Sequence, residues 1–264
     1  MGNQEQSAAA QANHERMDAL VVWVSFGCNV VLIISLILAV VFSGSISIVA
    51  SVLDSGLDLF SSIIMIVTTR AKTKVNRYKY PQGKERLEPV GVLIFSSVMG
   101  TASLLLIIEA VQRLLENPIP KPDVGWISTG FVIADIVIKF CLFLFCRRVP
   151  SITAKALAQD HRNDVLLNSV ALATSYIGSR VWAPTDSIGA IVIALYTMFN
   201  WGESCLEQVK YLTGRSASPD FLRRLTWVCY NHDAEIIGID TVRAFHFGTR
   251  YLVEIDIVLP PDMV

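Results

Sequence analysis

The fold is decided by residues 20–69, which read LVVWVSFGCNVVLIISLILAVVF (20–42), SGS (43–45) and ISIVASVLDSGLDLFSSIIMIVTT (46–69). Each of the two long segments is almost continuously apolar over more than 20 residues. An α-helix rises about 1.5 Å per residue, so each segment is long enough to cross the roughly 30 Å hydrocarbon core of a bilayer. The sequence therefore predicts two membrane-spanning helices joined by a tight turn.

Similar apolar blocks continue as far as Trp201, and the whole chain of 264 residues is 53% hydrophobic and only 17% charged. Soluble domains carry about 25% charged residues, and a net charge of −1 provides no field that attracts nucleic acid. This composition excludes a soluble enzyme, a nucleic-acid-binding protein and a secreted disulfide scaffold. The predicted fold class is an all-α membrane protein with six transmembrane helices, at 20–42, 46–69, 89–115, 124–146, 151–179 and 185–201.

The distribution of Lys and Arg predicts the orientation of these helices. Segment 70–88 and the connection around 147–155 are rich in basic residues, whereas the other three connections carry few or none. The two basic connections fall on one side of the predicted membrane, and basic loops stay in the cytosol. Both termini are therefore expected in the cytosol, with residues 1–19 as a short disordered tail and 20–210 as the transmembrane domain.

Residues 211–264 differ in composition and predict a small cytosolic α-β-β unit. Ser218 and Pro219 have the character of an N-cap and a first-turn proline, which would open a helix that runs to about residue 231. Two segments of strand character follow, at 241–247 and 251–259, and the alternation of the second predicts one buried face formed by Val253, Ile255 and Ile257. A unit of this size can hardly bury a core alone.

Four carboxylates lie inside the predicted spans, where an ionised carboxylate costs at least about 2.5–3.5 kcal/mol. Asp54 and Asp58 belong to the second span, and Asp160 and Asp164 belong to the fifth. Each pair is spaced i, i+4, so both of its side chains project from one face of a helix. Counting at about 1.5 Å per residue from the helix ends places all four carboxylates near the middle of the membrane.

Four like charges cannot stay ionised together without a counter-charge, because each disfavours the ionised form of the others. Protons or a divalent cation would supply it, and competition between the two for the same oxygens is the chemistry of an exchanger. The alternatives are that the pairs form helix-packing hydrogen bonds or face a basic neighbour. Lys139 is one basic candidate, but Asp135, four residues earlier on the same span, is its simplest partner.

The predicted ligand set favours a hard cation. Four carboxylates suit Mn²⁺, followed by Fe²⁺, Ca²⁺ or Mg²⁺, whereas Zn²⁺ prefers nitrogen or sulfur ligands. His161 follows Asp160 directly and lies about 100° around the helix from it, so we expect His161 beside the site or along the ion path rather than on the metal. Asn168 continues the face of the aspartate pair and is a further candidate for contact with that path.

Several motifs resemble the cation diffusion facilitator family and, more narrowly, its manganese-type branch, to which the plant metal tolerance proteins belong. They are Ser43-Gly44-Ser45 with Asp54-Ser55-x-x-Asp58, the loop from Tyr80-Pro81-Gln82-Gly83 to Glu88-Pro89, Asp160-His161-x-x-Asp164, and residues 240–248 with 253–256. Zinc-transporting members usually have His where this chain has Asp160. The resemblance implies a homodimeric divalent metal/proton antiporter that moves Mn²⁺ from the cytosol into a vacuole or another endomembrane compartment. It implies no enzymatic activity and no cofactor besides the transported metal and the protons.

The resemblance also sets expectations for the C-terminal unit. The family's cytosolic domain is α-β-β-α-β and this chain ends after α-β-β, so the homodimer is expected to be weakened. Regulatory metal sites of the family would have only His232, His246 and Asp256 as candidates here, and we expect ordinary surface or core roles for them. Zn²⁺, Fe²⁺ or Co²⁺ as the substrate stays an alternative, as does a non-transporting regulatory paralogue. An intramembrane aspartyl protease is disfavoured because the chain lacks the paired Tyr-Asp and Gly-x-Gly-Asp motifs.

Overall fold

The structure is a computed structural model that describes residues 2–43, 46–73, 78–80, 83–116 and 126–261. Within these ranges the side chains of 2–15, 39–43, 46–51, 53–54, 73 and 127–128 lie outside the description. Six long helices come first, α1 (Gly2–Ser43), α2 (Ile46–Thr73), α3 (Leu87–Leu115), α4 (Trp126–Cys146), α5 (Ile152–Arg180) and α6 (Pro184–Leu212). A short helix α7 (Pro219–Tyr230) and two strands, β1 (Gly238–Phe247) and β2 (Arg250–Val258), follow.

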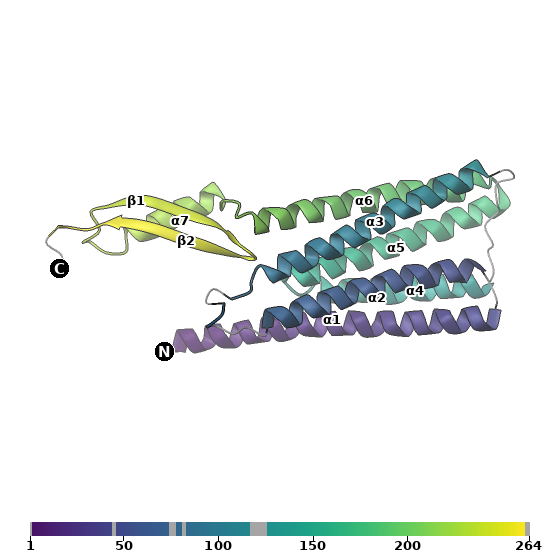
Figure 1. Cartoon of the computed structure of the whole chain (residues 1–264), viewed down its shortest axis with the longest axis horizontal. Helices are drawn as coiled ribbons and strands as arrows, with labels where there is room; N and C mark the ends of the chain where they lie inside the picture. Colours follow the sequence, from purple (N-terminus) through teal and green to yellow (C-terminus); the bar gives the residue numbers. More distant parts are fainter. Residues whose placement is uncertain (1, 44–45, 74–77, 81–82, 117–125, 262–264) are drawn as a thin grey trace.

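The long helices lie alongside one another in an elongated bundle (Figure 1). Helix α3 packs against α6, α4 against α5, and α1 against α2. The chain reverses direction between successive helices, so the N-terminus and the C-terminal α/β unit lie at the same end of the bundle (Figure 1). The expectation of a disordered tail over 1–19 is wrong, because α1 begins at Gly2. This segment is rich in Ala, Gln and Glu, which are good helix formers, and the adjoining apolar helix removes the cost of nucleation.

Three helical segments in the described part of the chain are long and apolar enough to cross a membrane, namely Arg16–Leu38, Leu87–Leu115 and Thr129–Cys146. Helix α5 falls short because its first half carries charged residues, and α6 mixes apolar residues with polar ones. The mostly helical fold and the membrane character are therefore confirmed, whereas six transmembrane helices stay a prediction.

A buried apolar cluster holds the bundle together near the end that carries the C-terminal unit. Val21 and Val22 of α1, Phe95 of α3, Leu157 of α5 and Trp201 of α6 are all at most 2% exposed. Phe95 and Trp201 meet edge to face with their ring centroids 5.4 Å apart. Because this cluster joins helices that are distant in the sequence, it fixes α5 relative to the rest of the bundle.

Close contact between α2 and α3 depends on Gly91, whose added Cβ would lie 2.5 Å from Oγ1 of Thr68. We expect Gly91→Ala to lower the free energy of unfolding by about 1–3 kcal/mol, as overpacking of a tight contact usually does. Gly130 on α4 has no atom within 4 Å of the corresponding position. Gly130→Ala is therefore the matched control and should be neutral or stabilising by about 0.5–1 kcal/mol. Thermal unfolding of the detergent-solubilised variants measures both, and equal stability of the two would contradict this account of the contact.

The C-terminal unit confirms the predicted order of helix, strand and strand. The side chain of Ser218 accepts a hydrogen bond from the backbone N–H of Phe221 and caps α7, as expected. Strands β1 and β2 form an antiparallel hairpin in which Phe247 lies opposite Arg250. The expected buried face of the second strand is wrong, because Val253 is 37% and Ile257 is 45% exposed. Two strands and one short helix that packs on β1 do not provide enough surface to cover it.

The tip of this hairpin lies against the segment that leads into α3. Gly248 has φ +65°, and an added Cβ would lie 2.6 Å from the backbone oxygen of Glu85. The guanidinium of Arg250 lies 3.5 Å from the Glu85 carboxylate, and the Arg86 guanidinium lies 4.4 Å from the ring centroid of Phe247. The unit is therefore in direct contact with the end of the helical bundle.

Candidate metal site

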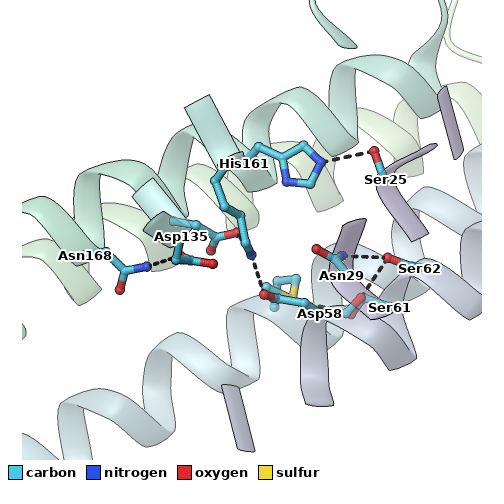
Figure 2. A network of polar contacts seen from close by, with 11 residues as sticks. Ser25, Asn29, Asp58, Ser61, Ser62, Asp135, His161 and Asn168 are labelled. Atoms are coloured by element: carbon cyan, nitrogen blue, oxygen red, sulfur yellow. Dashed lines mark hydrogen bonds and ion pairs between the residues drawn. The ribbon is translucent and has the colours of Figure 1, made fainter. Parts of the chain in front are cut away.

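The centre of the site is a buried ammonium group shared by two of the predicted aspartates. Lys139 of α4 donates hydrogen bonds to Oδ2 of Asp58 on α2 and, at 2.6 Å, to Oδ2 of Asp164 on α5. The side chain of Lys139 is only 3% exposed, and those of Asp58 and Asp164 are 12% and 18% exposed. Figure 2 shows Asp58 projecting from its helix towards this contact. The structure thus brings the second and fifth predicted spans together through a residue of the fourth.

The local structure of α5 explains how its side chains reach the interior. Ser151 caps the helix by accepting a hydrogen bond from the backbone N–H of Ala154 at 3.0 Å. One face then carries buried small and apolar residues such as Ala154 and Leu157, and it continues with Asp160 and His161. Because Asp164 follows Asp160 by about one turn, both carboxylates extend from the packed side of the helix.

Asp160, His161 and Asp164 form a group in which one candidate ligand atom of each residue lies within 4.8 Å of the others. Asp160 is 2% exposed and His161 is fully buried. Among the described residues, Oδ1 of Asp160 and Nδ1 of His161 have no hydrogen-bond partner. A buried polar atom without a partner costs about 1–3 kcal/mol, and an ion or a proton would remove that cost. The donor set of two carboxylates and one imidazole is chemically suited to a divalent cation.

His161 is held by a residue of α1. Its Nε2 lies 3.1 Å from Oγ of Ser25, a contact that Figure 2 shows from close by. A second α1 residue, Asn29, donates from Nδ2 to Oγ of Ser62 on α2 at 3.1 Å. Sequence reasoning assigned no role to either α1 residue. The signal was available, because Ser25 and Asn29 are both polar and four residues apart in an apolar helix, which is the same spacing that singled out the aspartates.

The expected ion pair between Lys139 and Asp135 is wrong. Lys139 instead bonds to carboxylates of two other helices, and Oδ2 of Asp135 accepts a hydrogen bond from Nδ2 of Asn168 at 2.7 Å (Figure 2). The physical reason is that two carboxylates compensate a buried ammonium better than one does. Asn168 therefore contacts the neighbour of the site on α4, and its contact with an ion path stays a prediction.

The other four residues singled out from the sequence are Asp54 on α2 and three candidates for regulatory metal sites in the C-terminal unit. The backbone of Asp54 belongs to α2, one turn before Asp58, but its side chain lies outside the described residues. His232 and Asp256 are exposed. The His246 ring contacts the rings of Tyr211 and Tyr251 at centroid distances of 4.8 and 4.4 Å. Burial lowers the pKa of His246. Where side chains are described, these three are not gathered with other ligands into a metal-binding group.

Comparisons with known proteins agree with the resemblance seen in the motifs. Residues 22–213 match the model of the cation efflux transmembrane domain. The chain is 41% identical over 251 residues to metal tolerance protein 10 of Arabidopsis thaliana, which covers 94% of this chain and 58% of the relative. It is 40% identical over 261 residues to metal tolerance protein 11 of the same plant, covering 97% and 66%. It is also 41% identical over 269 residues to metal tolerance protein 7 of Oryza sativa subsp. japonica, covering 100% and 68%.

The chain spans between about three fifths and two thirds of the length of these relatives. The matched domain model covers the second half of α1 and the whole of α2 to α6, including α2, α4 and α5, which carry Asp58, Lys139 and Asp164. The chain therefore belongs to the cation efflux family, whose members are transporters and not enzymes.

Proposed function

We propose that this chain transports a divalent metal cation across a membrane and that the buried carboxylates of α2 and α5 bind the ion. The observation that carries the proposal is the group of Asp160, His161 and Asp164, with two buried ligand atoms that have no partner among the described residues. Asp58 of α2 joins this group through Lys139. Asp54 is included on the basis of its sequence position, one turn from Asp58.

The same carboxylates account for coupling to protons. A metal ion binds carboxylates in their ionised form, so its binding releases protons and protonation expels it. A proton gradient across the membrane therefore drives metal in the opposite direction. With both termini in the cytosol, the direction is from the cytosol into a vacuole or another endomembrane compartment, and the protein works as a homodimer by alternating access.

Mn²⁺ is the proposed substrate because carboxylate oxygens dominate the site. A second candidate has a specific observation in its favour. His161 belongs to the group of candidate ligands. Zn²⁺, Fe²⁺ and Co²⁺ accept an imidazole nitrogen as a ligand more readily than ions that prefer oxygen ligands do. The relatives carry metal tolerance in their names, and these names do not distinguish the two candidates.

Uptake of radioactive Mn²⁺ into proteoliposomes tests the proposal. With an acidic interior we expect uptake that a proton ionophore abolishes and that empty liposomes lack. Excess Zn²⁺ should compete weakly if carboxylates alone hold the ion, and at least as strongly as unlabelled Mn²⁺ if His161 is a ligand. Absence of proton-driven flux for every divalent cation tested would overturn transport and favour a regulatory paralogue.

A further inference from the structure

Lys139 is a fixed positive charge inside a site that is built from acidic residues. It lies on α4, is 2% exposed, and donates to one carboxylate of α2 and one of α5. A buried ammonium is costly unless carboxylates and hydrogen bonds compensate it. The arrangement therefore joins three helices around one cation that belongs to the protein itself.

The oxygens that hold this ammonium are the ones that a metal ion would need. Oδ2 of Asp58 and Oδ2 of Asp164 both accept from Nζ of Lys139, and Asp164 also belongs to the group with Asp160 and His161. Two cations within a few ångströms of each other in a poorly solvated site repel by several kcal/mol at an effective dielectric constant of about 20. A divalent ion and the Lys139 ammonium therefore compete for the same carboxylates.

A second acceptor for the displaced ammonium lies on the same helix. Asp135 precedes Lys139 by four residues, so both extend from one face of α4. Asp135 is part-buried and its Oδ2 accepts from Asn168, which follows Asp164 by four residues on α5. Figure 2 shows Asp135 and Asp58 projecting into the same space between the helices. The flexible four-carbon stem of a lysine allows the ammonium to change partners.

We propose that Lys139 is a tethered counter-cation that occupies the carboxylate site when it holds no metal, that a bound divalent ion displaces it towards Asp135, and that it thereby sets the affinity for the ion. This inference rests on the proposed function, since it concerns the same site. When no metal is bound, the Lys139 ammonium compensates the negative charges of the carboxylates. Because the metal ion must displace this ammonium, its binding stays weak enough for the ion to be released on the other side of the membrane.

Equilibrium binding of Mn²⁺ to the full chain in detergent, followed by the EPR signal of the free ion, tests the inference. Lys139→Met keeps the length of the side chain and removes the competing charge, so we expect its Kd for Mn²⁺ to fall at least about 10-fold. Asp135→Asn removes the acceptor for the displaced ammonium and should raise the Kd by about 3- to 10-fold. Lys155→Met removes an exposed positive charge at the start of α5 and is the control, with an unchanged Kd.

The opposite signs of the two effects separate this role from a structural ion pair. A folded Lys139→Met protein that binds Mn²⁺ as weakly as the wild type, or more weakly, would overturn the inference. If Lys139→Met does not fold, Lys139→Gln replaces it with the same expected and contradicting results, and unchanged or tighter binding by Asp135→Asn overturns the displacement. Failure of the wild-type chain to bind Mn²⁺ would instead overturn Mn²⁺ as the proposed substrate.

Discussion

Asp160→Asn is expected to lower the initial rate of Mn²⁺ uptake into proteoliposomes by at least about 100-fold. The substitution keeps the shape of the side chain but removes a charge from a group in which Asp160 is 2% exposed. A bound metal ion that loses one buried carboxylate ligand is destabilised by about 3 kcal/mol or more. Each 1.4 kcal/mol corresponds to a factor of about ten in the rate or the affinity. Because Oδ1 of Asp160 has no hydrogen-bond partner in the described part of the protein, no protein hydrogen bond of that atom is lost.

The stability of the same variant distinguishes loss of a ligand from loss of the fold. We expect the metal-free Asp160→Asn protein to unfold at the wild-type temperature or above it, since removing one of several like charges relieves repulsion. Asp256→Asn removes an exposed carboxylate from β2 and should leave uptake unchanged. Wild-type uptake by Asp160→Asn would exclude this carboxylate as a ligand of the transported ion.

Glu88→Gln is expected to lower the free energy of unfolding by about 2–4 kcal/mol, because it removes a charge from a buried ion pair. Glu88 is 7% exposed at the start of α3, and its Oε2 accepts from Nζ of Lys72 on α2 at 2.6 Å. Its Oε1 accepts from Oγ1 of Thr153 on α5 at 3.2 Å and from the backbone N–H of the same residue at 3.4 Å. One carboxylate therefore joins three helices, and an amide removes the negative charge that is hydrogen-bonded to Lys72, whose Nζ also lies 3.9 Å from Oε2 of Glu85.

The same helix offers a matched control for this prediction. Glu109 of α3 pairs with Arg113 at 2.6 Å, but both side chains are about half exposed. Exposed ion pairs of this i, i+4 type contribute about 0.3–0.5 kcal/mol, so Glu109→Gln should change stability by no more than that. Chemical unfolding of both variants in the same detergent measures the difference. Equal stability of the two variants would show that burial of Glu88 contributes nothing.

The sequence predicted the helices well because their signals are local. Apolar blocks, the Ser218 cap and the alternation of strand residues all depend on near neighbours in the chain. The extent of α1 was missed because the polar composition of residues 2–19 indicated solvent exposure, whereas helix propensity and the adjoining apolar helix determine its backbone. The exposed face of β2 was missed because alternation indicates which side chains share a face and not whether anything covers that face.

In the candidate metal site too, some features could be predicted from local sequence and others depend on how the helices pack. Spacing alone identified the two aspartate pairs, and the structure brings Asp58, Asp160 and Asp164 together. The partner of Lys139 could not be predicted, because the choice between Asp135 on its own helix and two aspartates on other helices depends on how α2, α4 and α5 pack. Lys139 is 81 residues from Asp58 and 25 residues from Asp164 in the sequence, and contacts over such separations cannot be predicted from local sequence patterns.

An experimental structure of the full chain with Mn²⁺ would give the position of the bound ion from its anomalous scattering. We expect the ion within direct ligand distance of the carboxylates of Asp160 and Asp164, with Asp58 next to it and the Lys139 ammonium moved away from both Asp58 and Asp164. Anomalous peaks found only elsewhere, for example on the C-terminal unit, with Lys139 still bonded to Asp58 and Asp164 at saturating Mn²⁺, would exclude these carboxylates as the metal site.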